Sequence, residues 1–215
     1  MSGRRGIPFV VSAPSGTGKT TVCRAVVERD GGIDFSVSHT TRPPRPGEQD
    51  GVHYFFVSRE QFGRLVEEGA FVEHAEYAGN LYGTSREALD GPLGRGRDLL
   101  LEVEVQGARQ IRARRRDARF VFLLPPSVEE LERRLRGRGT DGDEEVARRL
   151  AIARQELGAV HDFDYAVVNE AFDETIESIL EIVRAERSGR TEDVRRRYGR
   201  ARVVAEVAGR LPIPG

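Results

Sequence analysis

A glycine-rich loop near the N-terminus contains the only lysine of the chain. Of the 34 basic residues, 33 are arginine, and the one lysine is Lys19. It lies in the segment Ala13-Pro14-Ser15-Gly16-Thr17-Gly18-Lys19-Thr20. Backbone N–H groups in such a loop can converge on phosphate oxygens, a lysine can reach the β- and γ-phosphates, and a threonine hydroxyl can bind Mg²⁺. The segment predicts an ATP-binding loop with Lys19 as a catalytic cation.

The match to the phosphate-loop pattern is incomplete at its first position. The pattern G-x-x-x-x-G-K-[ST] begins with glycine, where this chain has Ala13. A glycine-rich turn without a ligand is the alternative interpretation. We favour phosphate binding, because the loop connects a predicted strand to a predicted helix, and helix N-termini attract anions.

A second pair of cations follows within residues 36–47. Arg42 and Arg45 flank two prolines that stiffen the backbone. Planar guanidinium groups bind phosphate with two parallel hydrogen bonds. This segment therefore predicts a second anion site.

Alternating strands and helices are predicted to position these two sites. Apolar runs predict strands over 7–12, 99–105, 120–124 and 164–168. Helices are predicted over 19–30 and 107–116, and a closing helix carries the apolar stripe Ile176, Ile179, Leu180 and Val183. This alternation is typical of an α/β fold with a parallel core sheet flanked by helices.

Two inserts and a tail complete the expected organisation. Residues 35–85 predict a small mixed α/β insert with strands over 52–57 and 71–77, and a helix that begins at a Ser58–Gln61 capping box. Residues 126–159 predict a helical lid that begins at a Ser127–Glu130 capping box. The core domain then comprises 1–34, 86–125 and 160–187. Residues 188–215 are expected to form a frayed or weakly helical tail.

The overall composition argues against several classes of protein. The 34 basic and 35 acidic residues give a net charge of -1, which provides no field to hold nucleic acid. The arginine run over 112–119 is interpreted as a solvated helix face. No apolar run reaches the roughly 20 residues of a membrane helix. Cys23 is expected in the core, and the histidines lack metal-ligand spacing. We expect a soluble, cytoplasmic protein that binds neither nucleic acid nor membrane.

Five segments carry a family resemblance. They are Ser-Val-Ser-His-Thr-Thr-Arg-Pro-Pro-Arg at 36–45, Gly-Val-His-Tyr-Phe-Phe at 51–56, Gly-Asn-Leu-Tyr-Gly-Thr at 79–84, Leu-Glu-Val-Glu-Val-Gln-Gly-Ala at 101–108 and Leu-Pro-Pro-Ser at 124–127. Together with Glu73, this set resembles guanylate kinase, a family of P-loop nucleoside-monophosphate kinases. The resemblance extends from about residue 7 to residue 187.

The resemblance implies transfer of the γ-phosphoryl group of ATP to GMP, giving ADP and GDP in purine nucleotide metabolism and GMP recycling. Mg²⁺ is the implied cofactor, bound through Thr20 and the nucleotide, and dGMP is expected as a further acceptor. The implied ligands of the GMP phosphate are Arg42, Arg45, Tyr54 and Tyr82. Those of the base are Ser38, Glu73 and Thr84.

Chemistry favours guanine at Glu73 independently of the resemblance. Guanine offers N1–H and N2–H₂ as adjacent donors, which one carboxylate accepts together, whereas adenine lacks this donor pair. An exposed strand carboxylate is the alternative for Glu73, and Tyr54 and Tyr82 could equally be core aromatics. Glu102 could contact the guanine edge, order Mg²⁺-bound water or support the site indirectly. Glu102 and Glu104 stand where many family members have aspartate, so their contacts stay open.

The resemblance also implies a closing lid and an adenine contact. Arg134, Arg138 and Arg149 match the family's lid arginines, which stabilise charge on the transferring phosphoryl group. Asn169 matches the adenine-side contact, although it could simply cap a turn. Each of these arginines could instead belong to a solvated helix face.

Two rival functions are open at this level. A catalytically silent module could bind phosphopeptides through the same arginines, but it would not need Lys19 or a lid. A kinase acting on a sugar phosphate would not need Glu73 together with the two tyrosines. The sequence favours a GMP kinase over both.

Overall fold

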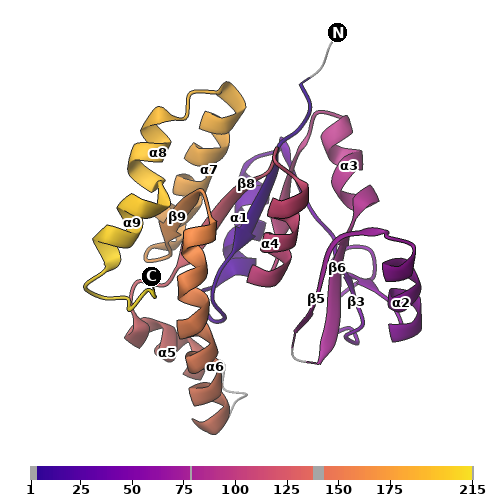
Figure 1. Ribbon diagram of the computed structural model, residues 1–215, viewed down its shortest axis with the longest axis horizontal. Coiled ribbons are helices and arrows are strands. Elements are labelled where there is room, and N and C mark those ends of the chain that lie inside the picture. The colour runs from indigo at the N-terminus through magenta and orange to yellow at the C-terminus, as the bar shows by residue number, and fades with distance from the viewer. Residues whose placement is uncertain (1–3, 78, 138–142, 215) are drawn as a thin grey trace. The chain divides into compact units, whose positions relative to one another are not determined.

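The computed structural model describes residues 4–77, 79–137 and 143–214. It divides into two compact units, and each is treated by itself below. Unit 1 comprises Met1–Phe9 and Gly31–Ala118, and unit 2 comprises Val10–Asp30 and Arg119–Gly215. Figure 1 labels the helices and strands along the chain.

A five-stranded sheet has the order β2-β7-β1-β8-β9. Its strands are listed here by residue: β1 Pro8–Ser12, β2 Ile33–Phe35, β7 Asp98–Glu102, β8 Arg119–Leu124 and β9 Tyr165–Val168. β2 pairs with β7 in parallel within unit 1, and β8 pairs with β9 in parallel within unit 2. All five residues of β1 are buried, as expected for a strand covered on both faces. The predicted α/β class with a parallel sheet is confirmed.

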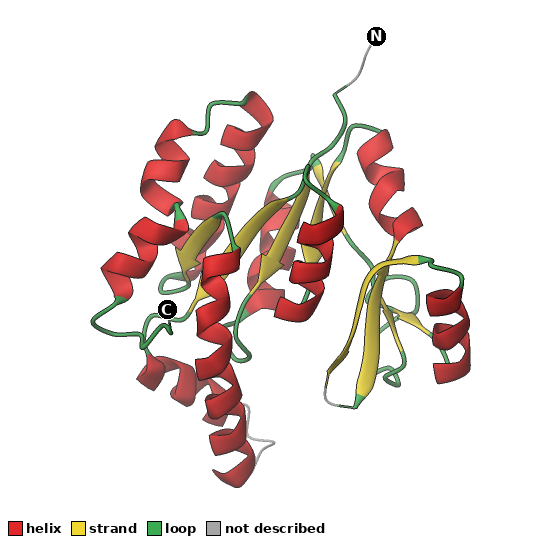
Figure 2. Ribbon diagram, viewed as in Figure 1, coloured by secondary structure: helices red, strands yellow, loops and turns green. Residues whose placement is uncertain are grey.

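Unit 1 also contains a mixed four-stranded sheet of order β4-β3-β6-β5. These strands are β3 His39–Thr40, β4 Phe55–Phe56, β5 Phe71–Tyr77 and β6 Asn80–Ser85, and they are yellow in Figure 2. Helix α2, Arg59–Glu67, begins at the predicted capping box, and its Phe62 stacks on Phe71 with ring centroids 4.6 Å apart. The predicted strand over 52–57 is wrong apart from β4, because residues 51–53 form a turn in which the N–H of Gly51 donates to Tyr54 O.

Two further helices belong to unit 1. They are α3, Arg86–Gly94, and α4, Val105–Arg114. The sequence predicted a strand through Val105, which is wrong, because β7 ends at Glu102 and the β-branched Val105 already begins α4. Glu104 precedes the helix in extended conformation, at the N-cap position. Glu102 and Glu104 therefore lie at the end of β7 and at the start of α4.

Unit 2 surrounds β8 and β9 with helices. The helices are α1 Lys19–Arg29, α5 Val128–Arg136, α6 Asp143–Glu156, the 3₁₀ helix η1 Leu157–Asp162, and α7 Phe172–Ser188. Cys23 is fully buried in α1, as predicted for a core residue. Val146 and Leu150 of α6 and Leu157 of η1 are all buried, and so is the predicted stripe Ile176, Ile179, Leu180 and Val183 of α7.

The C-terminal segment is helical, so of the two predicted alternatives, a frayed or a weakly helical tail, the frayed one is wrong. It forms α8, Glu192–Tyr198, which lies beside α7, and α9, Arg200–Val207, which lies beside α8 and β9; both helices are at the yellow end of Figure 1. Their apolar residues reach the core of unit 2, where Val194, Val203, Val207 and Leu211 are buried. These few buried apolar residues are widely spaced among arginines, so the sequence did not show that the segment packs on the core.

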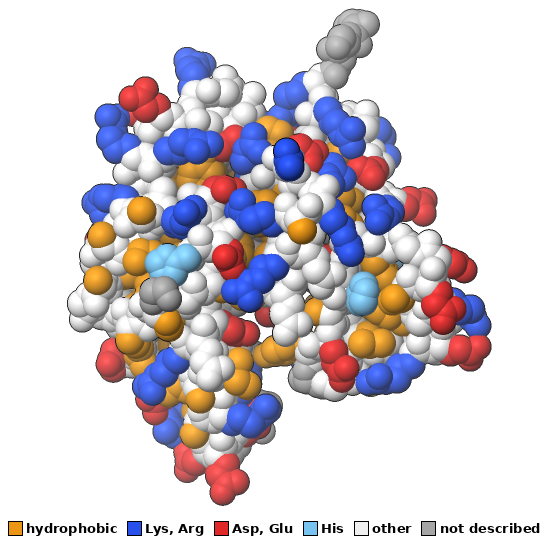
Figure 3. All heavy atoms as spheres, viewed as in Figure 1, with side chains coloured by type: hydrophobic (Ala, Val, Ile, Leu, Met, Phe, Trp, Pro, Cys, Tyr) orange, Lys and Arg blue, Asp and Glu red, His pale blue; other side chains and the backbone are white. Residues whose placement is uncertain are grey.

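The surface carries both signs of charge. Blue and red side chains are interspersed over the face drawn in Figure 3, in keeping with a net charge of -1. Among the described residues, no helix combines the length and apolar character needed to cross a membrane.

Candidate functional site

The phosphate loop of unit 2 has the backbone that its glycines predict. It connects β1 to α1, and Gly16 and Gly18 have φ values of +90° and +93°, in the left-handed region that disfavours residues with a Cβ. A Cβ on Gly16 would also lie 2.8 Å from Cδ2 of Leu135. Lys19 and Thr20 are the first two residues of α1, whose N-terminal N–H groups have no acceptor within the helix. The loop is therefore shaped to receive an anion.

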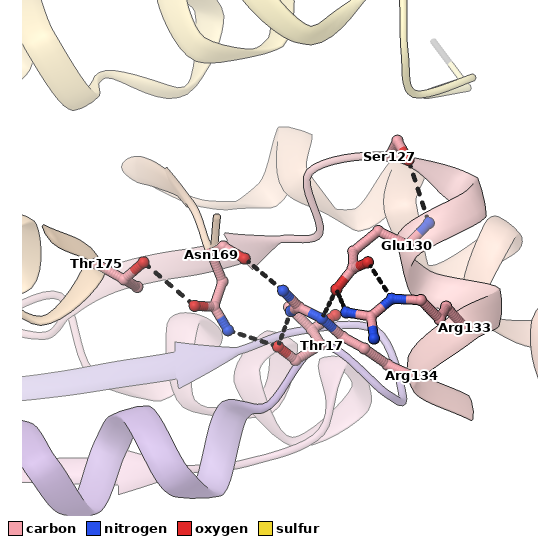
Figure 4. Close-up of polar contacts among 7 residues, drawn as sticks. All are labelled: Thr17, Ser127, Glu130, Arg133, Arg134, Asn169 and Thr175. Carbon is pink, nitrogen blue, oxygen red and sulfur yellow. Dashed lines mark hydrogen bonds and ion pairs between the residues drawn. The ribbon is translucent and has the colours of Figure 1, made fainter. Parts of the chain in front are cut away.

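Asn169 and Arg134 both attach to one carbonyl of this loop (Figure 4). Nδ2 of Asn169 donates to Thr17 O at 2.6 Å, and Nη1 of Arg134 donates to the same oxygen at 3.1 Å. Nη2 of Arg134 donates to Asn169 O at 3.0 Å. The structure thus brings two predicted site residues from α5 and the end of β9 onto the loop. Asn169 does more than cap a local turn.

Glu130 orients Arg134, a role that the sequence did not reveal. Its backbone N–H donates to Ser127 Oγ, which is one half of the predicted capping box. The other half is wrong, because the Glu130 carboxylate receives Nε of Arg134 at 2.7 Å and also binds Arg133 instead of the N–H of Ser127 (Figure 4). Hydrogen bonds from Arg133 and then Arg134 lower the pKa of Glu130 to about 2. The residue is therefore an ionised anchor for a lid arginine at neutral pH.

This pKa shift predicts a pH-dependent contribution to stability. Because the folded pKa lies below the unfolded value of 4.5, the contribution is present above about pH 4.5 and is lost as the pH falls toward 2. After allowance for solvent screening, we expect Glu130→Gln to destabilise the protein by about 1 kcal/mol at pH 7. The measurement is the difference in melting temperature between parent and variant from pH 7 to pH 3. A difference that does not narrow toward low pH contradicts the assignment, and Glu132→Gln on the same helix is the control.

Helix α6 contributes two further contacts to the loop. Nη2 of Arg149 donates to Ser15 Oγ at 3.0 Å, so this predicted lid arginine lies at the loop. The backbone N–H of Ser15 donates to Oε2 of Glu156 at 3.1 Å. A phosphate oxygen that bound this N–H would have to displace the Glu156 carboxylate. Sequence reasoning did not identify Glu156, and the predicted Arg138 lies outside the described residues.

The three residues expected around the base form one hydrogen-bonded line in unit 1. Oγ1 of Thr84 donates to Oε1 of Glu73 at 2.6 Å, and Oγ of Ser38 lies 3.3 Å from the Thr84 hydroxyl. A threonine hydroxyl has one proton, so Ser38 supplies the proton of the second bond. Glu73 is 4% exposed and Thr84 is fully buried. The alternative of an exposed strand carboxylate is therefore wrong for Glu73.

The predicted phosphate ligands also gather in unit 1. The guanidinium carbon of Arg42 lies 5.4 Å from the ring centroid of Tyr54, whose ring is 6.0 Å from that of Tyr82. Both tyrosines are only half-buried, which argues against a purely structural place in the core. Arg45 lies in the same turn and is exposed.

Glu48 holds this turn together and was not found from the sequence. Its carboxylate receives Nη2 of Arg42 at 2.8 Å and the backbone N–H of Arg45 at 2.7 Å. The hydrogen bond from Arg42 lowers the pKa of Glu48, and the same bond raises the pKa of Arg42. Glu48 therefore orients the Arg42 guanidinium.

Glu102 and Glu104 lie where the five-stranded sheet passes into α4. Glu102 is the last residue of β7, Glu104 is the N-cap residue of α4, and both are half-buried. This position follows the carboxyl end of a parallel strand, where ligand-binding residues of α/β folds gather.

The fold and these two clusters define a P-loop kinase of the nucleoside-monophosphate class. A family model described as guanylate kinase matches residues 5–186. The chain belongs to the guanylate kinase family, and it is an ATP-dependent phosphotransferase that converts GMP to GDP in purine nucleotide metabolism.

Named relatives agree with this family. Guanylate kinase of Alkalilimnicola ehrlichii is 52% identical, over 85% of this chain and 90% of the relative. The Escherichia coli K12 guanylate kinase is 48% identical, over 85% of this chain and 89% of the relative. A crystal structure of guanylate kinase from Anaplasma phagocytophilum superposes with a TM-score of 0.72 at 38% identity, covering 86% of this chain and 88% of that chain.

Proposed function

We propose that Glu73, Thr84 and Ser38 read the guanine base of GMP. The observation that carries this proposal is the buried hydrogen-bonded line through Thr84 to Glu73. Thr84 occupies one lone-pair direction of Oε1 and fixes the carboxylate, which leaves acceptor capacity for the paired N1–H and N2–H₂ donors of guanine. Glu102 is the proposed additional contact at the base edge.

The phosphate of GMP is assigned to Arg42, Arg45, Tyr54 and Tyr82. Two guanidinium groups and two hydroxyls can donate to several phosphate oxygens at once. Glu48 already accepts from Arg42 and from the backbone of Arg45, so the charged groups of the turn are ordered before substrate arrives. Such preorganisation lowers the entropic cost of binding.

ATP is assigned to the phosphate loop, residues 13–20, with Asn169 on the adenine side. No protein nucleophile is needed, because an oxygen of the GMP phosphate attacks the γ-phosphorus and ADP leaves. Lys19 stabilises the β- and γ-oxygens, and Arg134, Arg138 and Arg149 are the proposed cations for the transferring group. The insert over 35–85 is the proposed GMP-binding part of the chain, and residues 126–159 are the proposed lid that carries the arginines.

Mg²⁺ fits the residues present at the loop. Thr20 is exposed at the second position of α1, two residues after the left-handed Gly18, and a threonine hydroxyl is an oxygen ligand of the kind that Mg²⁺ prefers. When bound, Mg²⁺ supplies charge neutralisation on the β- and γ-oxygens. We propose the cytoplasm as the compartment and dGMP as a second acceptor.

The experiment that tests the proposed specificity is a coupled ADP-release assay across acceptors. GMP should be the best acceptor, with AMP, CMP, UMP and ribose 5-phosphate lower by at least about a hundredfold in kcat/KM, since each lacks the donor pair that Glu73 needs. Comparable rates with AMP would contradict the role of Glu73. Preference for the sugar phosphate would contradict the entire base site.

Arg149 provides a test of the lid. We expect Arg149→Ala to lower kcat by at least about tenfold, with the KM for GMP within about twofold, because a cation that acts on the transferring group stabilises the transition state selectively. Arg148→Ala is the matched control, since Arg148 is an exposed neighbour that pairs with Glu145. Equal kcat values for both variants would contradict a role of Arg149 in phosphoryl transfer and favour the alternative of a solvated helix face. Steady-state kinetics with a thermal melt supply the readout.

A further inference from the structure

The strand that carries Glu73 is irregular at the preceding residue. In the β5–β6 ladder, Phe71 pairs with Ser85 and Glu73 pairs with Thr84, so the register shifts between Phe71 and Glu73. Two steps along β5 oppose one step along β6, which is the count of a β-bulge with Val72 as the extra residue. A bulge changes the direction of the next side chain. The position of Glu73 therefore depends on whatever stabilises this bulge.

Helix α4 supports the bulged edge through two side chains. The amide of Gln110 makes two bonds to the backbone of His74, accepting from its N–H at 3.2 Å and donating to its carbonyl at 2.7 Å. Nη1 of Arg114 donates to the carbonyl of Val72. β5 is an edge strand of its sheet, so the backbone groups of His74 and Val72 that face away from β6 have no neighbouring strand. Without Gln110 and Arg114 they would need solvent or another partner.

The spacing of helix and strand matches. Gln110 and Arg114 are four residues apart on α4, a rise of about 6 Å. Their targets, His74 and Val72, are two residues apart on β5, a separation of about 6.6 Å. One face of the helix therefore substitutes for a neighbouring strand along the segment that contains Glu73.

Gly107, one turn before Gln110, allows the helix to approach the Glu73 carboxylate. A Cβ built on Gly107 would overlap Oε2 of Glu73 and lie 3.0 Å from its Cδ. Gly107 itself is buried. Any larger residue here must displace the carboxylate, so the absence of a side chain has a geometric reason.

We propose that Gly107, Gln110 and Arg114, here called the α4 clamp, are positioning residues that set the guanine-reading carboxylate of Glu73. The inference rests on the proposed role of Glu73 in base recognition. Gln110 is the central member, because its amide makes two bonds at once, accepting from the N–H of His74 and donating to the carbonyl of His74. A carboxylate would repel the carbonyl, and a thioether would leave both bonds unmade.

The first test uses Gln110→Met and Gly107→Ala. Each should reduce kcat/KM for GMP by at least about tenfold, because displacements near 1 Å are costly at a positioned group. The KM for ATP should stay within about twofold. Gly107→Ala should melt within a few degrees of the parent, because alanine favours a helix over glycine. Arg116 is exposed and lies just after α4. Arg116→Met is therefore the control, and its kcat/KM for GMP and its melting temperature should match those of the parent.

A double-mutant cycle with Glu73→Gln separates positioning from general support. If the clamp acts through the Glu73 carboxylate, Gln110→Met should lower kcat/KM by less than about threefold in the Glu73→Gln background. Full additivity of the two losses would overturn the proposal, as would a Gln110→Met variant that loses thermal stability but uses GMP normally. If Glu73→Gln alone leaves GMP use intact, the guanine assignment fails instead. The two failures are thereby distinguishable.

Discussion

Replacing Lys19 with arginine should nearly abolish phosphoryl transfer, with kcat lower by at least about a hundredfold. Charge is conserved in this variant, but shape is not. Lys19 is the first residue of α1 and directly follows Gly18, which like Gly16 has a left-handed backbone. An ammonium on a thin stem can lie against the β- and γ-oxygens there, whereas a planar guanidinium collides with the loop or displaces the phosphate.

Steady-state GDP formation and a thermal melt of the Lys19→Arg variant check this expectation. Arg24→Lys, the reverse exchange at an exposed position of the same helix, is the matched control and should keep activity within about twofold of the parent. The Lys19 variant should remain folded, since the side chain is not part of the core. A folded variant with near-parental activity would make the single lysine of this chain a compositional accident.

The parts of the site that could be predicted are those encoded by contiguous residues. The phosphate loop is such a case, because the glycines, the lysine and the strand-loop-helix context all lie within about a dozen positions. The capping box at Ser58 and Gln61 is another, since both bonds are local. Ser38, Glu73 and Thr84 were inferred from a family resemblance, and the structure adds the hydrogen bonds that join them.

The groups that orient the site residues could not be predicted, for two different reasons. Gln110 acts on His74, 36 residues away in sequence, and no local pattern distinguishes it from any other glutamine on a helix. Glu130 and Glu48 are close to their arginines, but acidic residues near arginines are common on solvated surfaces. Only burial and geometry show that these carboxylates hold particular guanidinium groups.

The errors in the predicted elements also have physical causes. The run 52–57 is apolar and aromatic, yet the turn at residues 51–53 takes up its first half. Val105 continues an apolar run, and its strand propensity was outweighed by the start of α4. The segment after residue 187 was predicted to be frayed or weakly helical, because it is rich in arginine. It instead buries Val194 on α8 and the i, i+4 pair Val203 and Val207 on α9, too few apolar residues to form a continuous stripe in the sequence.

Glu73→Gln should lower kcat/KM for GMP roughly 150-fold, which corresponds to a loss of about 3 kcal/mol of transition-state stabilisation. Thr84 Oγ1 donates to Oε1 of Glu73, so in the variant the amide oxygen can keep that bond only by turning its NH₂ toward the guanine donors. Two donors then face each other in a site that is 4% exposed at this residue, where an unpaired donor cannot recover its hydration. The alternative orientation breaks the bond to Thr84 and offers guanine one acceptor instead of two.

Selectivity should change together with efficiency in this variant. IMP keeps the N1–H of guanine and lacks the 2-amino group, so the parent enzyme should have a higher kcat/KM for GMP than for IMP. Glu73→Gln should reduce this ratio, because the side chain at position 73 then has one acceptor oxygen instead of two. The KM for ATP should be nearly unchanged. Glu76→Gln, an exposed carboxylate on the same strand, is the control for the loss of charge. Kinetics with GMP and IMP on the three proteins decide the matter: if the Glu73 variant keeps both the parental efficiency and the parental preference, the base is read elsewhere.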